Sequence, residues 1–363
     1  MTTVRRTAAL AVRLARQHLD ARVEDAATAA YVGLQDTPPG SAGQSLAARM
    51  VDASPSDLDS LVIVPSLRGA PLAVAREDLA VFTAGVAPPD DKAAAVLIGN
   101  AAKALPDGVG SLEALDRVSD AVGDALSDGP LERDDFHQAL RDRLPKDLLW
   151  WCKGCQSHHV HPSLWRATGI RGVLAIGGRA GGRTAIFEAP PRAAKVDDPA
   201  GELARRFLRA YGPATHSLLA AWAGIAPAHA KELWERAGEL AEVKLEGKKA
   251  FVLADDVDVW ASPPEVEGVR LLPGYDGFLA ARDRELLQPD EGLRKQQWRP
   301  LGNPGAVLRD GKLSGTWRAA KKGKKLTVTV DWFTSRPPKR ALSEEAATLA
   351  VWRDVDDVSV VVS

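Results

Sequence analysis

The stretch SLVIVPSLRGAPLAVAREDLAVF, residues 60–82, decides which fold the sequence predicts. Two apolar runs flank a turn around Arg68 and Gly69, and a short helical pattern follows them. Short apolar runs separated by turn residues are typical of a β-hairpin. Because alanine-rich helical patterns precede this hairpin, the segment 1–90 is expected to contain helices followed by a strand pair.

The same order of elements recurs twice further along the chain. Helical patterns precede GVLAIGGRAGGRTAIFEAP at 172–190, which predicts two strands joined by a glycine-rich tip. Further helical patterns precede AEVKLEGKKAFVLADD at 241–256, which predicts a hairpin with its turn at Glu246 and Gly247. Helices followed by a two-stranded wing are the order of a winged helix.

We therefore expect an α+β protein with three tandem winged-helix modules and a small C-terminal β-barrel. The expected boundaries are 1–90, 91–195 and 196–262 for the modules and 263–363 for the barrel. Short β-type runs joined by Gly, Asp and Pro turns indicate a small β-barrel or sheet domain there. Winged helices bind either DNA or proteins, so the fold alone does not settle the function.

Composition narrows the class of protein. The chain has 363 residues, of which 45% are hydrophobic and 26% charged, as in ordinary globular proteins of two to four domains. Only 2 cysteines are present, which excludes a disulfide framework. The N-terminal run contains arginines and no cleavage site, and no stretch reaches the ~20 apolar residues of a membrane span. A cytoplasmic protein is therefore expected.

The overall charge does not favour a nucleic-acid partner, because 47 basic residues face 48 acidic ones and give a net charge of −1. The distribution is more informative. RDGKLSGTWRAAKKGKK, residues 309–325, is rich in Lys and Arg and contains a single acid, Asp310. Such a patch can neutralise phosphates. The alternative is a solvated hairpin tip whose lysines keep a strand edge from aggregating.

Four stretches resemble the AlkZ-like DNA glycosylases, a family of winged-helix DNA-binding proteins. LQDTPPGSAGQSLAAR at 34–49 resembles the family's Gln-x-Gln segment, with Arg49 at the family's distance, and SLRGAPLAVAREDL at 66–79 its first wing. ARRFLRAYGPATHSLLAAWAGI at 204–225 and LLPGYDGFLAARDR at 271–284 are similar to its last winged helix and its barrel. The resemblance implies winged helices in a C-shaped arrangement around duplex DNA, and excision of alkylated purines or unhooking of crosslinks.

The resemblance also implies that paired polar side chains position the water that attacks the anomeric carbon. Here Gln35 is retained, Thr37 stands at the second polar position, and Asp36 lies between them where the family has a small or apolar residue. The first wing also lacks the histidine that many relatives carry.

Gln35, Asp36 and Thr37 are the candidate catalytic residues. A carboxylate can stabilise a cationic sugar and take a proton from water, and Gln35 and Thr37 can hold that water by hydrogen bonds. On this hypothesis Asp36 is the base. The alternative is a turn in which Asp36 or Thr37 bonds free backbone N–H groups at the next helix, which an S-x-x-Q capping box predicts to begin at Ser41.

WCKGCQSHHVHPSLW at 151–165 combines two cysteines with three histidines. Thiolate and imidazole are preferred zinc ligands, and the zinc candidates are Cys152, Cys155, His159 and His161. The spacing is compressed for a zinc site, and His158 and His159 are expected to face opposite ways. We therefore predict no metal, no cofactor, and a turn entering the second module.

The expected partner is double-stranded DNA, either damaged or undamaged, and the expected oligomeric state is a monomer. Basic residues on the wings and near the motifs are the expected DNA contacts: Arg49, Arg68, Arg179, Arg183, Lys248, Lys249, Arg318, Lys321 and Lys322. The predicted function is hydrolysis of the N-glycosidic bond of alkylated bases with water as nucleophile. The alternatives are a non-enzymatic DNA-binding regulator or damage sensor, and a protein-interaction scaffold.

Overall fold

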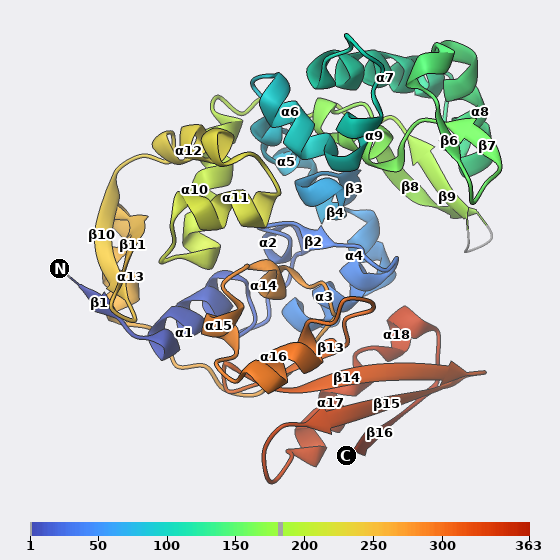
Figure 1. The fold of residues 1–363 in the computed structure, drawn as a ribbon. Coiled ribbons are helices and arrows are strands. Elements are labelled where there is room, and N and C mark those ends of the chain that lie inside the picture. The colour runs from blue at the N-terminus through green and yellow to red at the C-terminus, as the bar shows by residue number, and fades with distance from the viewer. Residues whose placement is uncertain (1, 181–183) are drawn as a thin grey trace. The chain divides into compact units, whose positions relative to one another are not determined.

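The computed structural model describes residues 2–180 and 184–363, which divide into two compact units (Figure 1). The first unit combines Met1–Leu61, Arg205–Leu218 and Gly238–Ser363. The second combines Val62–Ala204 and Leu219–Ala237. Neither unit is one continuous stretch of the chain. The mixed helix and strand content confirms the predicted α+β class.

The first unit contains short helices and two sheets. Its helices are α1 Arg6–Arg16, α2 Ala26–Ala29, α3 Ser41–Arg49, α4 Pro55–Asp59, α13 Val257–Ala261, α14 Gly277–Ala280, α15 Arg284–Leu287, α16 Glu291–Gln297, α17 Lys339–Ala347 and α18 Ala350–Arg353. Its strands are β1 Thr3–Val4, β2 Leu34–Gln35, β10 Leu240–Leu245, β11 Lys248–Leu253, β12 Val269–Leu272, β13 Gly305–Arg309, β14 Lys312–Lys322, β15 Lys325–Trp332 and β16 Asp357–Val362. Two helices, α10 Pro199–Tyr211 and α11 His216–Ala223, contribute residues to both units.

The C-terminal strands form a single five-stranded sheet in the order β12-β13-β14-β15-β16. The sheet is curled into half of a barrel and has open edges at β12 and β16, so the β domain predicted at the C-terminus is present as a half-barrel sheet. Each strand from β12 to β15 pairs antiparallel with the next one in the sequence, whereas β16 pairs parallel with β15. Buried Leu342 and Ala346 place one side of α17 in the core with Val328 and Val330 of β15.

The hairpin β10–β11 turns at Glu246 and Gly247, as predicted, and β1 extends it on the β10 side in parallel. Helix α1 packs in the same core, because its Leu10 and Leu14 are buried with Val243 and Val252. This core lies under the N-terminal helix and contains side chains from segments that are more than 200 residues apart in the sequence.

The second unit contains β-hairpins among helices. Its elements are β3 Val62–Pro65, β4 Pro71–Val74, α5 Leu79–Phe82, α6 Asp91–Ile98, α7 Ser111–Leu126, β5 Leu131–Glu132, α8 Arg133–Arg143, β6 Trp150–Cys152, β7 Ser157–His159, α9 Pro162–Ala167, β8 Ala175–Ala180, β9 Thr184–Glu188 and α12 Pro227–Glu235. The order α7-β5-α8-α9-β8-β9 ends in a sheet in which β5 pairs with β9, and β9 with β8. Among the described residues, no helix is long and apolar enough to cross a membrane.

Candidate functional site

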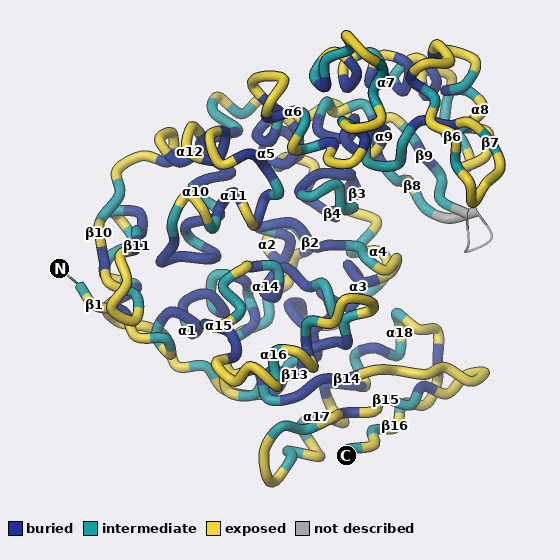
Figure 2. Tube along the Cα trace, viewed as in Figure 1, coloured by how far each residue is buried: buried dark blue, intermediate teal, exposed yellow. Residues whose placement is uncertain are grey.

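The segment that contains the candidate catalytic residues precedes a fully buried helix in the first unit. Gln35 ends the short strand β2 and is 8% exposed, whereas Asp36 and Thr37 are partly exposed. The Thr37–Pro38 peptide bond is cis. All nine residues of α3 are buried, so the turn is attached to a helix packed on every side (Figure 2).

Asp36 fixes the start of α3. Its Oδ1 accepts hydrogen bonds from the backbone N–H groups of Gly40, at 2.6 Å, and Ala42, at 3.1 Å. These N–H groups have no partner inside the helix, so a carboxylate there stabilises the first turn. The capping box predicted at Ser41 and Gln44 is wrong, because the residue before the helix is Gly40, with φ 89°, and the Ser41 Oγ donates to Pro38 O.

The far end of α3 is held by a buried ion pair. The Arg49 guanidinium is 1% exposed and donates to both carboxylate oxygens of Asp276, each at 2.7 Å. Asp276 is 0% exposed, accepts a further bond from Ser45 Oγ, and begins α14 by accepting from the Phe278 N–H. Burial raises the pKa of Asp276, but the charge and hydrogen bonds of Arg49, with the bonds from Ser45 and Phe278, outweigh burial and lower it.

Arg49 is therefore a structural residue, and its predicted contact with DNA is corrected. A buried side chain whose hydrogen bonds go to Asp276 and to its own helix does not reach a phosphate. No sequence motif singles out Asp276 as the partner of Arg49, although both residues lie in stretches that resemble the same family. The side of α3 near Gly43 is equally tight, because a Cβ there would lie 2.1 Å from the Trp352 ring.

The Tyr211-Gly212-Pro213 motif also has a packing role in this unit. The Tyr211 hydroxyl donates to Gly277 O at 2.9 Å, and its ring stacks on Phe207. Arg13, which is 1% exposed, donates to Gly212 O at 2.9 Å and pairs with Asp283 at 2.7 Å. The motif thus connects α1, α10 and the segment around α14.

The turn of the first hairpin, in the second unit, is also packed. Arg68 adopts φ 59° and is partly buried, and its guanidinium donates to Trp222 O. A Cβ on Gly224 would lie 2.7 Å from the Arg68 Cγ, so the arginine stem fills the space that the glycine leaves. The structure thus gives Arg68 a packing role in addition to the DNA contact predicted from sequence.

Those of the remaining basic candidates that the structure describes lie on hairpins. Lys248 is exposed on β11, and Lys249 pairs with Glu242 at 2.5 Å. Arg179 belongs to β8, whereas Arg183 lies outside the described residues. On β14, Arg318 and Lys322 are exposed, and the Lys321 Nζ donates to the backbone oxygens of Arg353 and Asp354.

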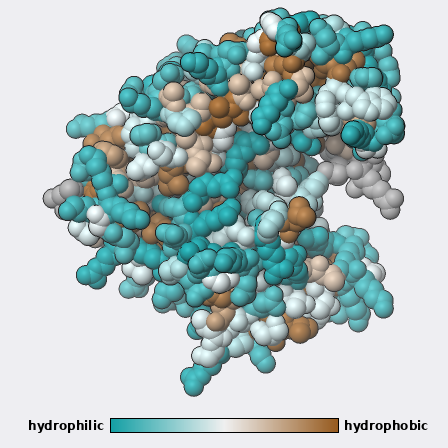
Figure 3. All heavy atoms as spheres, in the orientation of Figure 1, coloured by the Kyte–Doolittle hydropathy of each residue, from teal (hydrophilic) through white to brown (hydrophobic). Residues whose placement is uncertain are grey.

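The lysine-rich tip of β14 and β15 is less basic than its local sequence indicates. Asp354 pairs with Lys321 and Lys324, and Asp357 pairs with Lys325 at 3.6 Å. The C-terminal segment therefore brings Asp354 and Asp357 beside lysines whose own stretch, 309–325, contains only Asp310 as an acid. Where Figure 1 places this sheet, Figure 3 shows a surface of mainly hydrophilic side chains.

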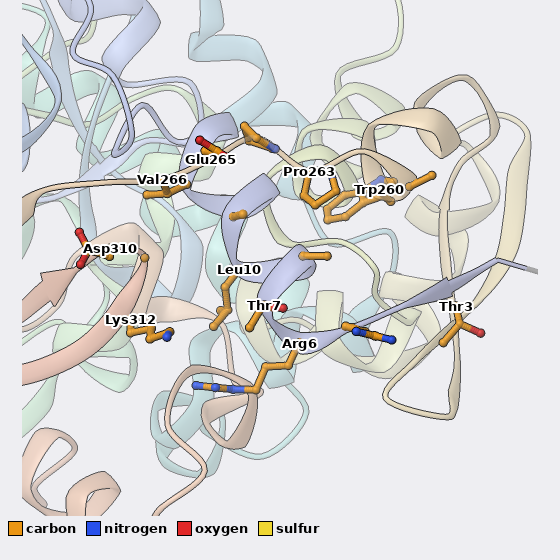
Figure 4. A pocket seen from close by; sticks show the side chains of 16 residues that line it. Thr3, Arg6, Thr7, Leu10, Trp260, Pro263, Glu265, Val266, Asp310 and Lys312 are labelled. Carbon is orange, nitrogen blue, oxygen red and sulfur yellow. The ribbon is translucent and has the colours of Figure 1, made fainter.

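A pocket of about 550 Å³ lies elsewhere in the first unit. Arg6, Thr7 and Leu10 of α1 line it, together with Trp260 and Lys312 (Figure 4). None of its lining residues belongs to the segment 35–37, so we do not assign the candidate chemistry to this pocket.

The hairpin β6–β7 gathers part of the cysteine and histidine motif. Ligand atoms of Cys152, Cys155 and His159 all lie within 4.8 Å of one another. His161 has a different role, because its Nδ1 accepts from the Ser163 N–H at the start of α9. His158 packs edge-on against Trp151, with ring centroids 4.9 Å apart.

Comparison with known proteins identifies the fold first. The solved structure of Streptomyces sahachiroi DNA glycosylase AlkZ matches with a TM-score of 0.75 over 100% of both chains, at 23% sequence identity. A likeness at that identity shows a shared fold.

The family follows from sequence. The family model described as DNA glycosylase AlkZ-like matches residues 28–352. An interstrand DNA cross-link repair glycosylase from Streptomyces sahachiroi is 32% identical over 251 residues, which cover 65% of this chain and 66% of the relative, just under two thirds of its length. The chain belongs to the AlkZ-like DNA glycosylase family, which confirms the resemblance derived from its motifs.

Proposed function

We propose that the chain is a monofunctional DNA glycosylase that hydrolyses the N-glycosidic bond of an alkylated base in double-stranded DNA. Water is the nucleophile, and the proposal requires no cofactor in that reaction. One observation carries it: Gln35, which the resemblance puts at the first polar position of the family's motif, lies in the family-matched range, ends a strand and directly precedes a turn attached to the fully buried helix α3.

In this mechanism Gln35 and Thr37 hold the attacking water. An amide offers both a donor and an acceptor, and a hydroxyl offers the same, so the pair can orient a water without taking its proton. Alkylation of a purine ring nitrogen gives the base a positive charge and makes it a good leaving group. Because the base leaves readily, the protein can accelerate hydrolysis by positioning the water alone.

We assign Asp36 a positioning role in place of the general-base role derived from sequence. Its carboxylate accepts two backbone N–H bonds at the start of α3, and this contact holds the turn between Gln35 and the helix. Asp36 thus acts through Gln35 and Thr37.

We also propose that parts of the chain are winged-helix modules. The order α7-β5-α8-α9-β8-β9, with β5 paired to β9, supports this assignment for the second module. The isolated bridge between Ala214 and Phe251 of β11 supports a similar first strand for the third. Exposed Lys248, Arg318 and Lys322 are our candidates for phosphate contacts. Monomeric state and cytoplasmic location stay predictions from the sequence.

The substrate class proposed is a bulky alkylated purine, including one that links two strands. The related Streptomyces sahachiroi protein is named for interstrand cross-link repair, and it shares 32% identity over 251 residues with this chain. Wild-type protein should release the modified base from duplexes with N7- or N3-alkylated purines, and should leave an abasic site without cutting the strand.

The measurement is chromatography of free base together with alkaline cleavage of the abasic product. An unmodified duplex of the same sequence is the control. A protein that binds duplex at low salt and releases no base would contradict the proposal. Preference for one undamaged sequence would then favour a regulator, which reads bases instead of lesions.

A further inference from the structure

The hairpin β6–β7 in the second unit has a geometry that suits a thiolate-binding metal ion. Residues Trp150, Trp151 and Cys152 pair with His159, His158 and Ser157. Trp150 and Cys152 are two residues apart on one strand, so they share a face of the hairpin, and His159, opposite Trp150, shares it too. His158 therefore points to the other face, where it meets Trp151.

The turn of this hairpin adds the second cysteine. Lys153, Gly154, Cys155 and Gln156 connect the strands, with Gln156 at φ 51°. The Gln156 side chain closes the turn by donating to Lys153 O at 2.6 Å. The turn brings Cys155 back over the face of Cys152 and His159, and the three ligand atoms lie within 4.8 Å of one another.

The turn directs backbone N–H groups at the Cys152 sulfur. The N–H groups of Cys155 and Gly154 both bond to it. Metal ions bind the thiolate form, so backbone N–H groups directed at a cysteine sulfur favour a metal ligand there.

His159 is oriented as metal-binding histidines are. Its ring is 8% exposed, and its Nδ1 lies 2.8 Å from Val160 O. A backbone carbonyl on Nδ1 favours a proton there and leaves the Nε2 lone pair for a ligand, which is the usual second contact of a metal-bound imidazole. Trp150 packs edge-on to this ring, with centroids 5.7 Å apart, and restricts its rotation.

A buried polar atom lies beside the cluster. His137 of α8 has its ring centroid 5.5 Å from that of His159, and its Nδ1 is buried without a hydrogen-bond partner among the described residues. Figure 1 shows α8 beside β6 and β7, and contacts join α8 to β7.

We propose that Cys152, Cys155 and His159 bind one Zn²⁺ ion, with the fourth position open to solvent on the exposed Cys155 side. Two thiolates and one imidazole are ligands that Zn²⁺ prefers, whereas Mg²⁺ and Ca²⁺ take oxygen ligands. The ion would join the turn to β7 and so stabilise the hairpin against α8. This site is independent of the glycosylase reaction, which needs no metal in the proposed mechanism.

The test is metal content of the full chain, purified under reducing conditions, by mass spectrometry of the elements. Wild type should retain about one zinc per chain. Cys155→Ser should lose it, and folding of this variant is not in question because Cys155 is exposed. His158→Asn is the matched control, since it changes an imidazole in the same hairpin on the opposite face, and it should keep the metal.

A second measurement identifies the ligands. Cobalt(II) added to the metal-free protein should give thiolate-to-metal charge-transfer absorption in wild type and His158→Asn, with a weaker band in Cys155→Ser. Absence of zinc together with absence of this absorption would overturn the proposal. Loss of two free thiols in the non-reduced wild type, without metal, would assign the pair to a disulfide instead.

Discussion

Replacing Arg49 by methionine should lower the free energy of unfolding by about 3–5 kcal/mol, because it leaves the buried carboxylate of Asp276 without its partner. Asp276 is 0% exposed, and both of its oxygens accept from Arg49. Chemical denaturation followed by tryptophan fluorescence measures the loss. Arg340→Met, which breaks the exposed pair with Glu344, is the control and should leave the midpoint unchanged.

The pH dependence follows from the lowered pKa of Asp276. A carboxyl whose folded pKa lies below its unfolded value of ~3.9 adds stability above that pH and loses it as the pH falls through the folded pKa. The difference in the free energy of unfolding between wild type and Arg49→Met should therefore become smaller in acid. A double variant, Arg49→Met with Asp276→Leu, should recover much of the loss. If Arg49→Met alone is as stable as wild type, the Arg49–Asp276 pair does not stabilise the fold as described.

The second large effect concerns catalysis. Gln35→Ala should lower the single-turnover rate of base release by about 10²-fold, the range expected for losing one positioned hydrogen-bonding group. Gln35 is 8% exposed, so Gln35→Met is the better matched change, since it keeps the volume and removes the amide. Both variants should bind the alkylated duplex with wild-type affinity. A Met variant with the wild-type rate would show that the amide holds no water.

Local sequence patterns predicted the hairpins and the long helices well. The strand pairs at residues 62–74, 175–188 and 240–253 follow from apolar runs and turn residues that lie next to one another in the chain. Val23, Ala27, Tyr31 and Leu34 fall at helical spacing, which indicates a longer helix than the structure has. Helix α2 covers only Ala26–Ala29, because Val23 bridges to Met50 and Gly33 adopts φ 75°.

The determinants of the site were harder to predict, because they depend on contacts distant in sequence. The sequence predicts a DNA contact for Arg49, whereas the structure pairs Arg49 with Asp276, which is 227 residues away in the chain. From sequence, Asp36 is either a general base or a turn residue that bonds backbone N–H groups. The bonds from the Gly40 and Ala42 N–H groups to its carboxylate favour the second alternative, and they depend on coordinates that the sequence does not give. The compressed Cys and His spacing looked unsuited to a metal, yet the register of β6 and β7 brings Cys152 and His159 to one face.

Single-turnover base release by Asp36→Asn tests the central claim most directly, namely that Gln35 positions the water on a turn that Asp36 holds. Asparagine still accepts N–H bonds from Gly40 and Ala42 and serves well at helix starts, but it is not a base. We expect a rate within about threefold of wild type, because the asparagine side chain still accepts the N–H bonds at the start of α3. A loss as large as that of Gln35→Ala, with duplex binding intact, would contradict it and make the Asp36 carboxylate the general base.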